Sequence, residues 1–187
     1  MLTIPNILTL LRLLAVPVFI VASFRGQFTL AFALFVGAAV TDILDGAIAR
    51  RFNQKSRLGA LFDPAADKTM MIAGYLFYTL RGGLPMVNIP AWLTFTVFIR
   101  DFLILSFAYL LYTRVRVKRF PPSWAGKTST VVQAVTLGAT IAVNAFLPQL
   151  LGFAELLFKV TVVMTLVSGW DYMRRAEAML DPAPAPK

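Results

Sequence analysis

Six long apolar runs divide the chain, and each is close to the roughly 20 mostly apolar residues that a helix needs to cross a bilayer. Most prolines lie at the ends of these runs or between them, as helix punctuation requires, whereas Pro17 falls inside the first run and predicts a kink. The pattern predicts an all-α integral membrane protein with six transmembrane helices. The runs, some with polar interruptions, cover residues 7–24, 28–49, 60–80, 89–112, 129–147 and 151–173.

Basic residues alternate between the short connections of this predicted bundle. The second and fourth connections and the C-terminal end are rich in Arg and Lys, whereas the first holds only Arg25, the third only Arg81 and the fifth none. Since basic residues gather in cytoplasmic loops, both termini are predicted to be cytoplasmic. We expect residues 1–176 to form a single membrane domain and the proline-rich segment 177–187 to be disordered. The first run lacks a basic leader and a small-residue cleavage site, so we interpret it as a retained helix.

The composition also favours a lipid bilayer as the surroundings of this chain. The chain is 58% hydrophobic and 14% charged, whereas soluble domains carry roughly 25% charged residues. A soluble fold would leave a large apolar surface exposed. The net charge of +9 could suggest nucleic acid, but the cations lie in clusters between apolar runs, so we expect no nucleic-acid partner. The chain has no Cys and no His, which leaves carboxylates, Lys, Arg and hydroxyls for any chemistry.

Five acidic residues lie inside the second, third and fourth predicted spans, where each costs roughly 2.5–3.5 kcal/mol near the bilayer centre. Four of them have helical spacing, because Asp42 and Asp45 are three apart and Asp63 and Asp67 are four apart. The connection between the two helices is short, so we expect antiparallel neighbours whose four carboxylates converge near the cytoplasmic mouth. Such an oxygen cluster suits a hard divalent cation, Mg²⁺ or Mn²⁺. The fifth is Asp101.

Small residues and one cation accompany these carboxylates. Gly46, Gly59 and Ala49 leave room for a phosphate or nucleotide to approach the backbone. Arg50 places a fixed positive charge beside the cluster, suited to a phosphate oxygen. The alternative is that the small residues only permit close helix packing and that an Asp only makes structural hydrogen bonds.

These positions together resemble the signature of the CDP-alcohol phosphotransferase family. The matching residues are Asp42, Asp45, Gly46, Ala49 and Arg50, followed by Gly59, Asp63 and Asp67 at fixed spacing. The resemblance extends to the six helices and the compact length.

The resemblance implies a reaction and a set of roles. The acceptor alcohol attacks the phosphorus that bears the lipid of CDP-diacylglycerol, and CMP leaves. Asp42, Asp45, Asp63 and Asp67 would hold two divalent metals, with Asp67 as general base. Homodimers are typical of the family. The expected contacts to the CDP-diacylglycerol come from Asn6, Asp42, Gly46, Ala49, Arg50, Ser56 and Gly59.

The amino-terminal run from Ile4 to Arg12 resembles the start of phosphatidylglycerophosphate synthases and of related cardiolipin synthases. We therefore expect Asn6 and Arg12 to line the headgroup cavity. A helix-entry turn at Pro5 and an interfacial arginine explain the same residues equally well.

The acceptor requires fixed cations for its phosphate. Lys127, where the fifth helix is expected to begin, resembles a Gly-Lys pair of both synthase groups, and Arg100 is a second candidate. Lys127 could instead anchor at the lipid interface, and Arg100 could only pair with Asp101. In glycerophosphate-accepting relatives a Glu tends to follow this Arg, and a further Arg lies near the end of the helix. Residues 102–109 hold no basic residue, which keeps other acceptors open.

Glycerol-3-phosphate is the favoured acceptor, in an inner-membrane enzyme whose site faces the cytoplasm. Phosphatidylglycerol, which would give cardiolipin, is the main alternative, and an inositol phosphate is less favoured. Membrane prenyltransferases also present Asp clusters to Mg²⁺, but with longer chains and other spacings. An ion or proton transporter using the four Asp residues as a relay is a remote alternative, because no repeated pair of broken helices is present.

Overall fold

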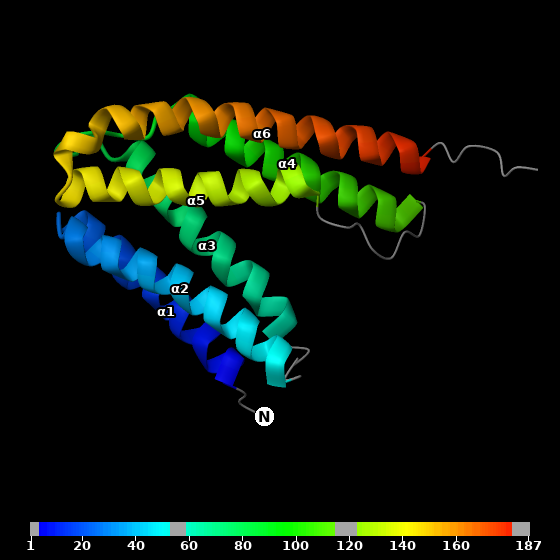
Figure 1. Cartoon of the computed structure of the whole chain (residues 1–187), viewed down its shortest axis with the longest axis horizontal. Helices are drawn as coiled ribbons and strands as arrows, with labels where there is room; N and C mark the ends of the chain where they lie inside the picture. Colours follow the sequence, from blue (N-terminus) through cyan, green and yellow to red (C-terminus); the bar gives the residue numbers. More distant parts are fainter. Residues whose placement is uncertain (1–3, 53–58, 115–122, 181–187) are drawn as a thin grey trace, which may run out of the picture. The chain divides into compact units, whose positions relative to one another are not determined.

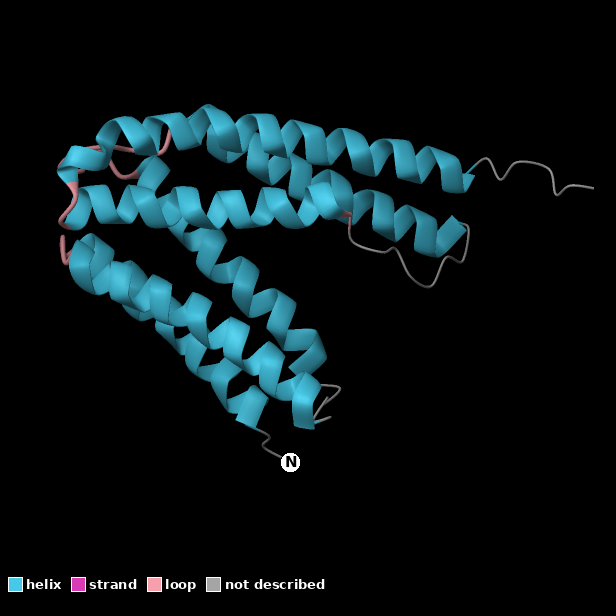
Figure 2. Ribbon diagram, viewed as in Figure 1, coloured by secondary structure: helices cyan, strands magenta, loops and turns pink. Residues whose placement is uncertain are grey.

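The protein is all-helical in the part of the chain that its computed structural model describes, residues 4–52, 59–114 and 123–180. The predicted all-α class is therefore confirmed, and each α-helix overlaps one of the six apolar runs (Figure 2). The elements are α1 (Ile4–Phe24), α2 (Phe28–Phe52), α3 (Gly59–Leu80), α4 (Ala91–Arg114), α5 (Trp124–Ala145), the short 3₁₀ helix η1 (Pro148–Leu150) and α6 (Leu151–Leu180).

One described segment, Pro148–Arg175, is long and apolar enough by length and composition to cross a membrane, and shorter apolar helices cover Leu10–Phe24 and Phe28–Asp42. Most residues of the long segment are exposed, as are large apolar side chains on other helices, such as Phe95 and Phe102. Surfaces of this kind are consistent with a membrane protein. The number of spans and the side of the termini stay predictions.

The sixth helix is longer than expected. α6 continues to Leu180, so residues 177–180, which were predicted to belong to a disordered tail, are helical. Residues 176–180 are Ala, Glu, Ala, Met and Leu, all good helix formers. Pro182 then disfavours the helical conformation of the residue before it. Residues 181–187 lie outside the described residues.

The chain divides into two compact units. The first contains Met1–Ile89 and Leu137–Ala154, and the second contains Pro90–Thr136 and Glu155–Lys187. In the first unit, α1 packs against both α2 and α3, and α3 runs opposite to α2 (Figure 1). α1 continues through Pro17 and ends in a Schellman turn, in which the Gln27 N–H donates to the Ala22 carbonyl at 2.9 Å. Gly26 takes the left-handed conformation that this turn requires, with φ of 73°.

Aromatic and small residues fill the interior of the first unit. Phe19 and Tyr78 are fully buried, and the ring of Phe28 lies 6.3 Å from that of Tyr78. Gly74 of α3 is needed for close packing, because a Cβ there would lie 2.5 Å from a methyl carbon of Leu137 on α5. These contacts pack α3 against the start of α2 and against α5.

A buried amide connects α5 to the segment that follows α3. The Asn144 side-chain oxygen accepts hydrogen bonds from the backbone N–H groups of Met86 (3.0 Å) and Val87 (3.4 Å). Its amide nitrogen donates to the carbonyl oxygens of Val87 and Thr140, both at 2.9 Å. One side chain therefore satisfies two N–H groups and two carbonyl groups of the backbone.

The second unit is joined by a polar seam between α5 and α6. Gln133 donates to the hydroxyls of Ser129 and Thr165, both at 3.3 Å, and the hydroxyls of Thr136 and Thr161 lie 2.6 Å apart. All five side chains are buried. Such interhelical hydrogen bonds stabilise helix pairs where the surrounding lipid offers no hydrophobic driving force.

We predict that Asn144→Leu lowers the free energy of unfolding by about 1–3 kcal/mol, because partly buried backbone groups of residues 86 and 87 lose their partner. Thermal unfolding of the detergent-purified protein measures the effect. Asn88→Ala is the matched control, since that amide donates a single hydrogen bond to the Arg81 carbonyl, and its effect should be smaller. Equal stability of Asn144→Leu and wild type would contradict this role.

Candidate active site

A buried ion pair joins α1 to α2 at the first position of the acidic signature. The Arg12 guanidinium donates to one carboxylate oxygen of Asp42 at 2.9 Å. Arg12 is 4% exposed as a residue, whereas the side chain of Asp42 is 44% exposed. A cation this deeply buried needs a partner, because its desolvation alone costs several kcal/mol. Arg12, which was expected to line the headgroup cavity, contacts a predicted metal ligand directly.

The pair leaves Asp42 able to bind a second group. An ionised carboxylate offers about four lone-pair positions on two oxygens, and the hydrogen bond from Arg12 uses one of them. Nearly half of the Asp42 side chain remains accessible. Arg12 therefore fixes the orientation of this carboxylate without consuming its capacity to bind a cation.

The backbone of α2 and α3 holds most of the other predicted site residues. Asp42, Asp45, Gly46, Ala49 and Arg50 lie on the single uninterrupted helix α2. The spacing of three between the two Asp residues places them on one helical face, as expected. Gly59, Asp63 and Asp67 lie in the first turns of α3, and Asn6 lies in the first turn of α1.

Several of these predictions fall on residues whose side chains lie outside the described part of the structure. They are Asn6, Asp45, Gly46, Ala49, Arg50, Gly59, Asp63 and Asp67, and Ser56 falls wholly outside the described residues. Among the side chains that the structure describes, no three acidic groups gather into a metal site, and Asp42 is the only one of the four predicted ligands among them. The convergence of the four carboxylates stays a prediction.

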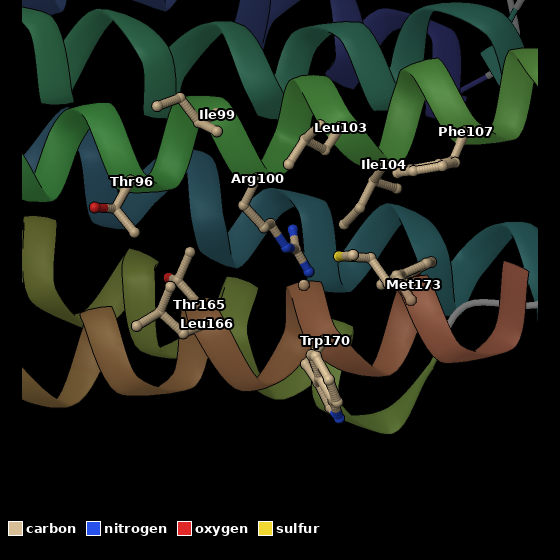
Figure 3. A pocket seen from close by; sticks show the side chains of 12 residues that line it. Thr96, Ile99, Arg100, Leu103, Ile104, Phe107, Thr165, Leu166, Trp170 and Met173 are labelled. Carbon is tan, nitrogen blue, oxygen red and sulfur yellow. The ribbon is translucent and has the colours of Figure 1, made fainter. Parts of the chain in front are cut away.

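The second unit holds Arg100, the first of the two acceptor candidates. Its guanidinium donates to the Asp101 carboxylate at 2.7 Å and to the Ser168 hydroxyl through Nε at 3.1 Å; Nη2 also donates to Ser168. The charge lies 5.8 Å from the centre of the Tyr172 ring. Figure 3 shows Arg100 reaching from α4 toward α6. The alternative that Arg100 pairs with Asp101 is therefore observed, together with a tether to α6.

Arg100 lines a pocket of about 480 Å³ between α4 and α6. The other walls are mostly apolar, including Ile99, Leu103, Leu166 and Met173 (Figure 3). Because the guanidinium is 8% exposed and already engaged by a carboxylate and a hydroxyl, it offers little to an acceptor phosphate.

Lys127, the second acceptor candidate, lies in the first turn of α5, as expected. Ser123 caps this helix, since its hydroxyl accepts the Gly126 N–H at 2.9 Å. The Lys127 ammonium lies 5.4 Å from the centre of the Trp124 ring, and its residue is exposed. Gly126 has no room for a side chain, because the Tyr172 ring would lie 2.9 Å from a Cβ. An accessible cation beside a helix N-terminus suits an anion.

Sequence reasoning missed the Arg12–Asp42 pair and the role of Ser168. Arg12 was noted as a charge in an apolar run and Asp42 as another, 30 residues apart, but no local spacing connects residues on different helices. The available signal for this ion pair was a positive charge in the first apolar run and a negative charge in the second. Ser168 has no signal of its own, because serine is common in apolar helices.

The described residues form an all-helical fold that is consistent with a membrane protein, and they carry paired and accessible charges within apolar helices. The family model for CDP-alcohol phosphatidyltransferases matches residues 2–168. The chain is 35% identical over 177 residues to a "Probable phosphatidylglycerophosphate synthase" of Mycobacterium tuberculosis H37Rv, an alignment covering 91% of this chain and 80% of the relative. It is 33% identical over 180 residues to the "CDP-diacylglycerol--glycerol-3-phosphate 3-phosphatidyltransferase" of Escherichia coli K12, covering 95% and 96%. A protein of the same description from Shigella flexneri gives the same identity and coverage.

The chain belongs to the CDP-alcohol phosphatidyltransferase family. The predicted resemblance is thereby confirmed, and the protein is a transferase. Members of this family use a CDP-alcohol donor and an alcohol acceptor and generally depend on a divalent metal.

We predict that Asp101→Asn lowers the free energy of unfolding by about 1–3 kcal/mol, because it leaves the buried Arg100 charge without its carboxylate. Glu155→Gln is the matched control, because Glu155 is an exposed residue of α6, where a substitution usually changes stability by about 0.5 kcal/mol or less. Thermal unfolding of both variants in detergent measures the difference. Equal losses would contradict a structural role for the Arg100–Asp101 pair.

Proposed function

We propose that the protein transfers the phosphatidyl group of CDP-diacylglycerol to glycerol-3-phosphate and releases CMP. The observation that carries the proposal is Asp42, the first residue of the family's acidic signature, held by Arg12 with much of its carboxylate still accessible. It lies within a family match that covers residues 2–168. The Escherichia coli relative is named for transfer to glycerol-3-phosphate, and its alignment covers nearly the whole chain. This supports glycerol-3-phosphate as the acceptor.

The donor set fits a divalent cation site. Asp42 has free lone-pair capacity, and Asp45, three residues later on α2, shares its face. Asp63 and Asp67, four residues apart in the first turns of α3, would complete an all-oxygen set of the kind that Mg²⁺ and Mn²⁺ prefer. Two bound ions would polarise the phosphoryl oxygens and favour loss of the acceptor hydroxyl proton.

The remaining residues bind the donor and move the proton. Asp67 accepts the proton of the acceptor hydroxyl, whose oxygen forms a bond to the phosphorus that carries the diacylglycerol. The bond between that phosphorus and the oxygen of CMP breaks, and CMP leaves with the bonding pair. The residues assigned to the CDP-diacylglycerol are Asn6, Asp42, Gly46, Ala49, Arg50, Ser56 and Gly59.

Arg12 has a positioning role in this scheme. Its hydrogen bond holds one carboxylate oxygen of Asp42. Because this bond restricts rotation of the Asp42 side chain, the position of the second oxygen is fixed as well. A buried arginine stays protonated at any accessible pH. The Asp42 carboxylate therefore stays oriented whether or not substrate is bound.

Lys127 is the better of the two cations for the acceptor phosphate. It is exposed at the start of α5, whereas Arg100 is buried and engaged by Asp101 and Ser168. We therefore assign the phosphate contact to Lys127 and regard Arg100 as a residue that holds α4 to α6.

The same proposal includes the setting of the reaction. The enzyme would lie in the cytoplasmic membrane with the site facing the cytoplasm, where glycerol-3-phosphate and CMP are soluble, and would act as a homodimer. Phosphatidylglycerol as acceptor, giving cardiolipin, remains the second candidate, because Asp101 stands where glycerophosphate-accepting relatives tend to carry Glu.

Product analysis distinguishes the acceptors. Purified protein with radiolabelled CDP-diacylglycerol and Mg²⁺ should release CMP and form phosphatidylglycerophosphate when glycerol-3-phosphate is supplied. Phosphatidylglycerol or inositol phosphate, supplied in parallel, should give little product. Cardiolipin formed in preference to phosphatidylglycerophosphate would contradict the assignment. Asp67→Asn is the inactive control, because it loses the base and one metal ligand, and it should retain donor binding through the residues assigned to the CDP-diacylglycerol.

We predict that Lys127→Met raises the KM for glycerol-3-phosphate about tenfold or more, because the acceptor phosphate loses a charge-assisted contact. The KM for CDP-diacylglycerol should change little. Steady-state kinetics with each substrate varied in turn measures the split, and Lys159→Met, which removes an exposed lysine of α6, is the matched control. An unchanged KM for glycerol-3-phosphate would exclude Lys127 from the acceptor site.

A further inference from the structure

A second apolar groove lies in the first unit, between α1 and α3. Its volume is about 360 Å³, within the range of roughly 300–1,000 Å³ of pockets that hold small ligands. Arg81 is its only charged residue. The lining is Ile20, Phe24, Ala73, Leu76, Phe77, Leu80 and Arg81.

The end of this groove that holds Arg81 lies far from the acidic signature. Arg81 follows the last residue of α3 and contacts the end of α1, since its guanidinium donates to the Phe24 carbonyl at 2.6 Å and to the Ser23 carbonyl at 3.4 Å. Arg12, the partner of Asp42, lies twelve residues before Phe24 on α1. This is a separation of about 18 Å along the helix. The groove is therefore not part of the proposed active site.

Among the described residues, no carboxylate pairs with Arg81. Its described partners are the two carbonyl oxygens and the rings of Phe24 and Phe77, whose centres lie 5.3 and 5.4 Å from the guanidinium carbon. The four acidic residues in the sequence of this unit all belong to the signature between positions 42 and 67. Arg25, the next residue after Phe24, is exposed and adds a second positive charge at the same helix end.

The walls of the groove face outward. Leu80 is 75% exposed and Phe24 is 59% exposed. An apolar groove that ends at an arginine matches a molecule with a hydrocarbon chain and an anionic head. A guanidinium binds phosphate oxygens well, because its planar donors match their geometry, and its position just beyond a helix end is where lipid headgroups are expected.

We propose that this groove binds one anionic phospholipid, with an acyl chain between α1 and α3 and the headgroup phosphate on Arg81. The lipid would contact both α1, which carries Arg12, and α3, which carries Asp63 and Asp67. Its headgroup would lie at the ends of these helices that are remote from the signature. The site does not depend on the identity of the acceptor or on the reaction.

A photolabelling experiment tests the site directly. The purified full-length protein is placed in phosphatidylcholine vesicles that contain a trace of phosphatidylglycerol with a diazirine on its acyl chain. A parallel sample contains phosphatidylcholine with the same label. The peptide that covers residues 73–81 should be labelled about fivefold more by the anionic lipid, the preference expected of one basic residue near a membrane surface.

Variants separate the charge from the groove. Arg81→Gln should abolish the preference for the anionic lipid, and Arg81→Lys should retain part of it. Ala73→Trp should fill the groove and reduce labelling by both lipids. Ala33→Trp, which adds the same bulk to an exposed position of α2, is the matched control and should leave labelling unchanged. If Arg81→Gln fails to fold because the end of α1 loses its partner, the comparison of Ala73→Trp with Ala33→Trp still shows whether the lipid occupies the groove.

Three results would overturn the proposal. Equal labelling by the two lipids would mean ordinary lipid contact only. Preference for the anionic lipid that survives Arg81→Gln would place its headgroup elsewhere. Absence of lipid labelling, with disulfide crosslinks between copies that carry Leu80→Cys, would mean that a second protein molecule covers this face.

Discussion

The structure depends on one constraint, that a charge within an apolar helix must find a partner. Arg12 finds Asp42 on the neighbouring helix, and Arg100 finds Asp101 beside it and Ser168 across the second unit. Arg81 finds the carbonyl oxygens at the end of α1. In each case the partner lies on, or leads to, a different helix, so satisfying the charge also fixes how two helices pack. Charged residues here are connections as well as chemical groups.

The ion pairs differ in how much of the carboxylate they leave accessible. This difference distinguishes a carboxylate that can bind a ligand from one that only stabilises helix packing. Arg100 is buried with its carboxylate mostly covered, so its pair is complete and serves packing. Asp42 is held on one side by a buried arginine and remains accessible on the other. An acidic residue that is oriented but not fully used is suited to a cation. The polar seam between α5 and α6 follows the first pattern, since its hydroxyls and its amide bond to one another.

Much of this could be predicted from the sequence, because the informative signals are local. The apolar runs predicted six helices, and the spacing of Asp42, Asp45, Gly46 and Arg50 placed them on one helix and pointed to the family. The start of α5 near Lys127 was also expected. The end of α6 was placed too early, because the prolines of the tail outweighed the helix-forming residues before them.

Contacts between helices could not be predicted in the same way. The Arg12–Asp42 pair spans thirty residues, and Asn144 holds a segment nearly sixty residues away; sequence spacing carries no information on such distances. Arg100 shows the opposite case, since its pairing with the adjacent Asp101 was readable from sequence whereas its tether to Ser168 was not.

Binding of Mn²⁺ to the purified protein, followed by electron paramagnetic resonance without substrates, tests the central claim most directly. The account predicts that the wild-type protein binds Mn²⁺, that Asp42→Asn, Asp45→Asn, Asp63→Asn and Asp67→Asn each weaken this binding strongly, and that Asp171→Asn leaves it unchanged. Arg12→Met should weaken it to a smaller extent, because the carboxylate of Asp42 loses its fixed orientation. Mn²⁺ binding that is the same in wild type and in the four signature variants would contradict the account.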